Sequence, residues 1–282
     1  MGGRNPEQAL ARLLLDQPGI AHRLFLRLSF LVAGATAAMV AGGFTLRVPA
    51  MVDLWPWADT PLSFAFLGAV MAALAGGSLW IGLSGDWRSA VPSLFGLLLI
   101  SAASAGYLWW LDQDDGVGDL EVQIAVMAAG ASFALIMLFL AKGGDPNLSR
   151  MAPLARFSCL FYGLALGFVG YALIERWDTV FPWALQPETS TVFGIVFAGL
   201  AVIYLLTAWN GERGGGIVVM LGFLVYDALL LPRLLPLVSS ITPELLPSLI
   251  AYVVVLIYSA AVAVDFLFLG GRRATQADGI DA

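Results

Sequence analysis

Eight long apolar runs, each about the length of a membrane-spanning helix, constrain this chain more than any other feature of its sequence. A helix needs roughly 20 consecutive apolar residues to cross about 30 Å of hydrocarbon. The runs are Leu26–Leu46, Leu62–Leu83, Ala90–Leu111, Val122–Ala141, Leu154–Ile174, Thr191–Trp209, Ile217–Val238 and Leu246–Leu269. A membrane-spanning barrel would instead show segments of about ten residues with alternating polarity. We therefore predict an all-α integral membrane protein with eight transmembrane helices.

The composition supports the same class. Hydrophobic residues make up 60% of the chain and charged residues only 12%, whereas soluble domains have roughly 45–50% and about 25%. The sequence therefore indicates a polytopic protein whose first partner is the lipid bilayer.

The basic residues predict how the helices are oriented, because Lys and Arg accumulate on the cytoplasmic side of membrane proteins. An even number of spans puts both termini on one face, and of the 14 basic residues all but Arg47, Arg176 and Arg233 fall on that face. We expect both termini in the cytoplasm and the protein in the inner or plasma membrane. The competing interpretation is that the first run is a cleaved signal peptide that ends in the small residues 37–41.

The second half of the chain resembles the first at a shift of 126 residues (182 − 56). The matched positions include Pro56, Trp57, Ala58, Pro61, Gly68, Gly85 and Gly96, which fall on Pro182, Trp183, Ala184, Pro187, Gly194, Gly211 and Gly222. Ala and Leu match by chance in apolar sequence, but the proline–tryptophan spacing and the aligned glycines favour a duplication. Each unit has an even number of helices, so the two enter the membrane from the same side. We predict two parallel four-helix repeats related by an axis along the membrane normal.

This prediction divides the chain into five segments. Residues 1–24 form a cytoplasmic amphipathic segment on the inner leaflet, and residues 25–142 form the first four-helix repeat. Residues 143–153 are a cytoplasmic linker, and residues 154–270 form the second repeat. Residues 271–282 form a disordered cytoplasmic tail.

An aromatic-Pro-Trp tripeptide precedes the second helix of each unit. Proline removes a backbone donor and favours an extended turn, while tryptophan prefers the headgroup level of a bilayer. We predict that these tripeptides are interfacial anchors. The anchor residues are Trp55, Pro56 and Trp57 in the first unit and Phe181, Pro182 and Trp183 in the second. The alternative is a stacking platform for a ligand at the outer mouth, which would also involve Trp109 and Trp110.

The segment Phe181–Pro187 has the pattern Phe-Pro-Trp-x-Leu-x-Pro before a Gly- and Ala-rich helix. It resembles a helix start of uncharacterised bacterial multi-pass membrane proteins. The copy in the first half departs from the pattern, since Asp59 stands where the second half has Leu185. The resemblance implies a bacterial membrane protein but brings no activity with it.

Reactive polar residues are scarce, which removes several classes of function. The only histidine, His22, precedes the first run, and the only cysteine is Cys159. A bis-histidine haem site and a Ser-His or Cys-His catalytic pair therefore cannot form within the bundle. No phosphate-binding loop and no basic-aromatic pattern for nucleic acid is present. We expect no cofactor, no metal site and no nucleic-acid partner. An enzyme acting on lipid would need an interfacial carboxylate pair that the sequence does not assemble.

One acidic residue, Asp227, lies near the middle of the seventh run, where a carboxylate is costly unless it is paired or hydrated. The duplication matches it with Ser101. The functional interpretation makes Asp227 a carboxylate that couples protons or cations to transport through a cavity. The candidate pathway residues are Asp227, Ser101, Ser104, Tyr107, Tyr226 and Arg233, with Gln123 as a further candidate. Arg233 is the candidate counter-ion if the helix kinks at Pro232. The structural alternatives are that Asp227 is protonated and bonded to a Ser, Tyr or Gln, or lies shallower because the helix ends at Pro232.

Two classes of function remain. The first is a small-solute or ion permease with a carboxylate at the membrane midplane. The second is a non-catalytic membrane subunit or scaffold, as a homo-oligomer or with other membrane subunits. Its contact surfaces would be small-residue helix faces such as Gly34, Ala38 and Gly42 and the acidic outer loop of residues 111–121. Asp227 favours the permease, because a passive bundle has little need of a buried acid.

Overall fold

The computed structural model of the protein describes residues 19–113, 120–141 and 149–269. These residues are helical almost throughout. Most of the predicted amphipathic segment 1–24, most of the linker 143–153, the acidic loop 114–119 and the predicted tail 271–282 lie outside the described residues. The end of the first of these, residues 20–24, is the beginning of the first long helix.

Eight helices in the described part of the chain are long and apolar enough to cross a membrane. They are α2 (Ile20–Thr45), α4 (Pro61–Ser84), α5 (Val91–Asp112), α6 (Glu121–Ala141), α7 (Pro153–Ile174), α8 (Pro187–Asn210), α9 (Arg213–Leu234) and α10 (Leu246–Val264). Shorter elements are helix α3 (Pro49–Val52), 3-10 turns at Arg88–Ala90 and Leu235–Ser239, and a π-helical turn at Asp265–Leu269. The prediction of eight membrane-length helices is confirmed, and their length and composition are those of a multi-pass membrane protein.

Proline and glycine set the ends of two of these helices in the same way. Helices α4 and α8 begin at Pro61 and Pro187, where the missing N–H costs little because the first turn has no intrahelical partner for it. Both helices end before a glycine in the left-handed region, Gly85 with φ 74° and Gly211 with φ 63°. A side chain would strain that conformation. The local sequence therefore begins and ends these two helices at matched positions.

Helix α9 continues through Pro232 and ends at Leu234. The sequence offered an end or a kink at this proline. The helix does not end at Pro232: it adds two more residues and then tightens into the 3-10 turn at Leu235–Ser239. Asp227 therefore lies well inside α9.

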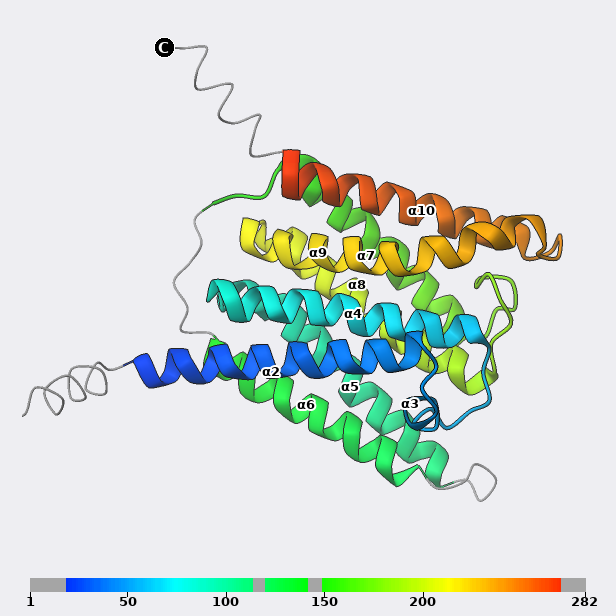
Figure 1. The fold of residues 1–282 in the computed structure, drawn as a ribbon, viewed down its shortest axis with the longest axis horizontal. Coiled ribbons are helices and arrows are strands. Elements are labelled where there is room, and N and C mark those ends of the chain that lie inside the picture. The colour runs from blue at the N-terminus through cyan, green and yellow to red at the C-terminus, as the bar shows by residue number, and fades with distance from the viewer. Residues whose placement is uncertain (1–18, 114–119, 142–148, 270–282) are drawn as a thin grey trace, which may run out of the picture.

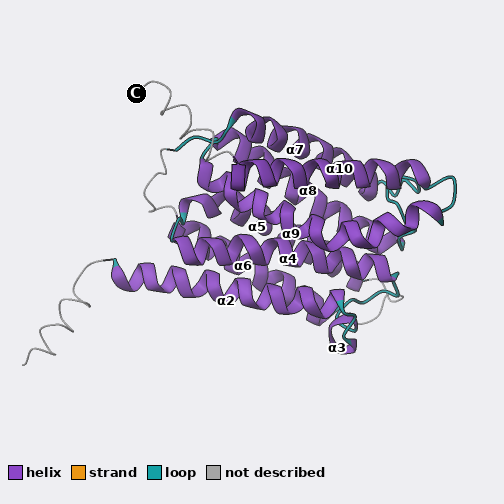
Figure 2. Ribbon diagram, turned by 45° about the horizontal axis from the view of Figure 1, so that its top comes forward, coloured by secondary structure: helices purple, strands orange, loops and turns teal. Residues whose placement is uncertain are grey.

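The eight long helices form a flattened ring of two layers (Figures 1 and 2). One layer contains α2, α4, α9 and α10, and the other contains α6, α5, α8 and α7, in that order. The joints α2–α6 and α7–α10 close the two ends of the ring and are looser than the joints within the layers. Helix α8 also touches α9 across the layers. The start of α2 and the end of α10 lie at the same end of the bundle (Figure 1).

The same pairs of helices meet in both halves of the chain. Helix α2 packs on α4 as α7 packs on α8, α5 packs on α6 as α9 packs on α10, and α4 packs on α9 as α8 packs on α5. Close approaches recur as well. A Cβ added to Gly34 would lie 2.7 Å from Leu79 Cγ, and one added to Gly163 would lie 2.6 Å from Leu205 Cγ. Leu79 and Leu205 are matched by the shift of 126 residues, whereas Gly34 and Gly163 are 129 apart.

Candidate functional site

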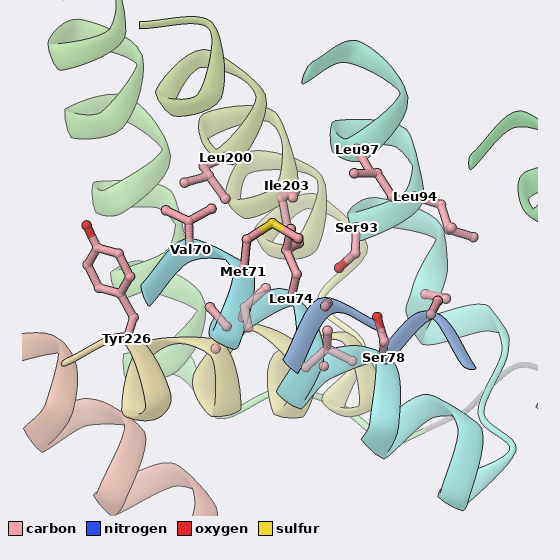
Figure 3. A pocket seen from close by; sticks show the side chains of 18 of the residues that line it. Val70, Met71, Leu74, Ser78, Ser93, Leu94, Leu97, Leu200, Ile203 and Tyr226 are labelled. Carbon is pink, nitrogen blue, oxygen red and sulfur yellow. The ribbon is translucent and has the colours of Figure 1, made fainter. Parts of the chain in front are cut away.

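A cavity of about 730 Å³ lies inside the ring and is lined by residues of all eight long helices. This is within the roughly 300–1,000 Å³ typical of small-molecule pockets. Figure 3 shows Tyr226 on one side of the cavity, Ser93 on the other, and apolar side chains such as Met71 and Leu74 between them. The polar residues in its wall are Ser29, Thr36, Ser78, Ser93, Tyr162, Tyr204, Tyr226, Asp227, Tyr252 and Ser259. Among the described residues that line the cavity, none is Lys, Arg or His.

Asp227 is the one acidic residue among the described residues that line this cavity. Its side chain is 1% exposed. Oδ2 lies 2.7 Å from Ser259 Oγ on α10, and Oδ1 has no hydrogen-bond partner among the described residues. One oxygen of this buried carboxyl group is therefore left without a hydrogen-bond partner among the described residues.

The hydroxyl of Ser259 has three acceptors within reach and a single proton. Ser259 Oγ lies 2.7 Å from Asp227 Oδ2, 2.9 Å from Leu256 O and 3.0 Å from Val255 O. If Asp227 were ionised, Ser259 would be its only donor among the described residues, and a buried carboxylate with one donor is costly. If Asp227 is protonated on Oδ2, the acid donates to Ser259 Oγ and Ser259 donates to its own helix. The geometry favours the protonated acid.

Aromatic side chains line the cavity close to Asp227. The ring of Phe223 lies 4.5 Å from that of Tyr162 and 4.7 Å from that of Tyr204, measured between centroids. The hydroxyls of Tyr226 and Tyr252 are hydrogen-bonded to each other. All five residues line the cavity. Asp227 therefore faces a space bounded by aromatic rings and hydroxyl groups.

The predicted pathway residues divide into two groups. Asp227 and Tyr226 line the cavity. The other four, Ser101, Ser104, Tyr107 and Arg233, are not among the described residues that line it.

The first three of these four lie on α5, in the other layer from α9. Ser101 lies next to α6, since a Cβ added to Gly130 would be 3.0 Å from its Oγ. Arg233 is exposed, and its Nη2 donates to Thr45 O at 3.1 Å. The further candidate Gln123 donates through Nε2 to Leu54 O at 3.1 Å. The sequence match of Ser101 with Asp227 did not place them together, because matched positions lie in opposite layers of the ring.

Sequence reasoning missed Ser259, the hydrogen-bond partner of Asp227, and three of the tyrosines that line the cavity. Tyr252 and Ser259 line the cavity from α10, and Tyr162 and Tyr204 line it from α7 and α8. Tyr252 and Ser259 are seven residues apart and so share one helix face. This spacing was the available signal, but it does not show which neighbouring helix the face meets.

The aromatic-Pro-Trp tripeptides differ between the two halves. Trp55, Pro56 and Trp57 are half-buried, whereas Phe181, Pro182 and Trp183 are buried within the protein. The indole N–H of Trp183 donates to Ser63 Oγ on α4 at 3.0 Å. The ring of Phe181 packs against Phe66 of α4 and Phe193 of α8, so the second tripeptide contacts the bundle itself, and its role as an interfacial anchor stays a prediction. The hydrogen bond from Trp183 to Ser63 joins the second half of the chain to the first.

The chain matches no protein-family model, no curated protein and no solved structure. Its function must be inferred from the geometry of the cavity.

Proposed function

We propose that this protein is a permease that couples the passage of a solute to the protonation of Asp227. One observation carries the proposal: a buried carboxyl group whose Oδ1 has no hydrogen-bond partner among the described residues stands in the wall of a cavity that residues of all eight long helices line. Ionisable residues inside membrane proteins commonly line substrate or proton pathways. A leucine would cost far less at this position if its only task were packing.

The chain is proposed to be two parallel four-helix repeats, of which α2–α6 form the first and α7–α10 the second. The recurring helix pairs support this arrangement, and so do the matched left-handed glycines Gly85 and Gly211. The only two described non-glycine residues with positive φ are Arg47 and Arg176, and each lies two residues after the first helix of its repeat. With this division the cavity lies between the repeats, where duplicated transporters hold their substrates.

The permease is proposed to lie in the inner or plasma membrane of a bacterium with both termini in the cytoplasm. The positive-inside rule supports this orientation, since Arg23, Arg88 and Arg213 lie at the same end of the bundle as the start of α2. The resemblance of Phe181–Pro187 to bacterial multi-pass proteins agrees with this location.

Transport in proteoliposomes tests the proposal. The purified protein is reconstituted with a pH-sensitive dye inside the vesicles, a pH gradient is imposed, and amines, sugars and organic acids are added singly. We expect at least one class of solute to discharge the gradient faster with the wild-type protein than in protein-free vesicles, and none to exceed that background rate with Asp227→Asn. The background is needed because amines and organic acids cross a bilayer in their neutral forms. The asparagine has the size of the protonated acid, and size-exclusion chromatography checks that the variant is folded.

Two results would refute coupling by Asp227. The first is discharge by Asp227→Asn at the wild-type rate. The second is a gradient that no class of solute discharges with the wild-type protein, which the alternative of a non-catalytic subunit or scaffold predicts.

A further inference from the structure

The cavity reaches the outer surface of the bundle at the loose joint between α2 and α6. Its wall includes Phe25, Leu28 and Val32 of α2, and each of these side chains is more than half exposed. In a helix that crosses a membrane, exposed apolar side chains of this kind face lipid. On the other side of the joint the wall is formed by Ala129, Gly130 and Phe133 of α6.

The corresponding joint between α7 and α10 is closed by tyrosines. The hydroxyl of Tyr258 lies 3.0 Å from Ser158 Oγ, and the hydroxyl of Tyr162 donates to Val255 O at 3.2 Å. These two bonds tie α7 to α10 across the joint.

The joint between α2 and α6 has smaller side chains at the positions matched with Tyr162, Val255 and Tyr258, whereas Ser158 is matched with another serine, Ser29. The shifts of 129 residues for the first helix and 126 for the fourth match Tyr162 with Ala33, Val255 with Ala129, Leu256 with Gly130 and Tyr258 with Ser132. No hydrogen bond between described side chains of α2 and α6 corresponds to those of the other joint. One end of the ring is therefore sealed and the other is left open.

The chemistry of the wall selects the charge of a ligand. The described lining has no cationic side chain, is largely apolar, and contains one carboxyl group beside tyrosine and phenylalanine rings. A carboxylate attracts a cation, and aromatic faces add cation–π attraction that grows when water is excluded. An apolar body bearing one positive charge therefore complements this wall, whereas an anion would lose hydration and find no cationic side chain among the described lining residues.

We propose that the cavity takes up lipophilic cations, such as alkylammonium or arylphosphonium ions, from the bilayer through the gap between α2 and α6. The cation displaces the proton of Asp227: the O–H bond at Oδ2 breaks, the proton goes to solution, and the carboxylate remains paired with the cation. The charge of the site is zero before and after the exchange. This inference rests on the proposed function, because it names the substrate class of the same site.

Proton release on ligand binding tests the substrate class. Tetraphenylphosphonium is titrated into the detergent-solubilised protein by calorimetry in two buffers with different ionisation enthalpies, near neutral pH. We expect about one proton released per cation bound, since Asp227 is the one acid that exchanges its proton. Tetraphenylborate, which has the same shape and the opposite charge, is the ligand control and should release none.

Two variants assign the released proton. Asp227→Asn should bind the cation at least about tenfold more weakly and release no proton, because the charged partner is gone. Ser259→Ala keeps the acid and should retain proton release. Cation binding by Asp227→Asn with wild-type affinity, or by the wild type without proton release, would overturn the exchange.

The path into the cavity is tested by filling the joint. The double variant Ala33→Tyr with Ala129→Leu places large side chains at both walls of the gap. The control, Ala35→Tyr with Ala128→Leu, makes the same changes at exposed positions of α2 and α6 that do not line the cavity. Stopped-flow tryptophan fluorescence should show cation association slowed about tenfold or more in the first variant, because access then needs a helix movement. The control should match the wild type.

The outcomes separate this inference from the proposed function. If a sugar or an organic acid discharges the pH gradient through Asp227 and no lipophilic cation binds, the substrate class is wrong and the proton-coupled permease stands. If the cation binds with proton release but the filled joint leaves its association rate unchanged, the path between α2 and α6 is refuted.

Discussion

The crossing of α7 and α8 is so close that one added methyl group at Gly194 should destabilise the whole bundle. A Cβ on Gly194 would lie 2.8 Å from Gly170 O, 2.7 Å from Ile174 Cγ1 and 3.0 Å from Ile174 N. Two of these three neighbours are backbone atoms, which cannot move aside by a change of rotamer. Gly194→Ala can be accommodated only if the two helices separate.

The size of the effect follows from this overlap. Forcing an extra carbon into a well-packed site typically costs about 1–3 kcal/mol. With a shift of about 2–4 °C per kcal/mol for proteins near this size, the Tm should fall by roughly 2–12 °C. Alanine has a better helix propensity than glycine by about 1 kcal/mol, so the low end of the range applies if the helices separate easily.

The assay uses the single cysteine of the chain as a reporter. Cys159 is 0% exposed, so a thiol-reactive fluorophore labels it only as the bundle opens on heating. Gly42→Ala is the matched control, because an added Cβ at Gly42 meets nothing within 4 Å. Its Tm should equal or slightly exceed that of the wild type. A Tm for Gly194→Ala at or above that of Gly42→Ala would show that the two helices are not held at this distance.

Two further changes probe single contacts with the same thermal assay. Trp183→Phe removes the buried bond from the indole N–H to Ser63 Oγ at 3.0 Å and should cost about 1 kcal/mol, whereas the exposed Trp110→Phe should leave the Tm unchanged; equal values for the two would contradict the contact. Arg88→Gln breaks the pair between Arg88 Nε and Glu212 Oε1, also at 3.0 Å. Because the arginine is 46% exposed, the loss should stay below about 1 kcal/mol, and a fall as large as that of Gly194→Ala would contradict this.

The sequence alone determined the eight helices but only some of their ends, since the runs predicted to begin at Leu26 and Ile217 belong to helices that begin at Ile20 and Arg213. A run of some 20 apolar residues in a bilayer must satisfy its backbone groups within itself, so it becomes a helix whatever surrounds it. Helices α4 and α8 begin at Pro61 and Pro187 and end before Gly85 and Gly211. These ends follow from the backbone preferences of proline and glycine and need no tertiary contact. The sequence also showed one acidic residue, Asp227, within the seventh run. The free-energy cost of a carboxylate there depends on its burial and not on which residues surround it, so it could be recognised from the sequence.

Only the tertiary structure decided which helices meet. Ser259 as the partner of Asp227, the inward turn of Trp183 and the distance of Arg233 from the site all depend on which helix faces pack together. Lipid-facing and protein-facing surfaces of these helices are equally apolar, so polarity gives no register for packing. What selects neighbours in a bilayer is shape, such as the glycine-to-glycine approach of α7 and α8. A cavity is what that packing leaves unfilled, and no single helix encodes it.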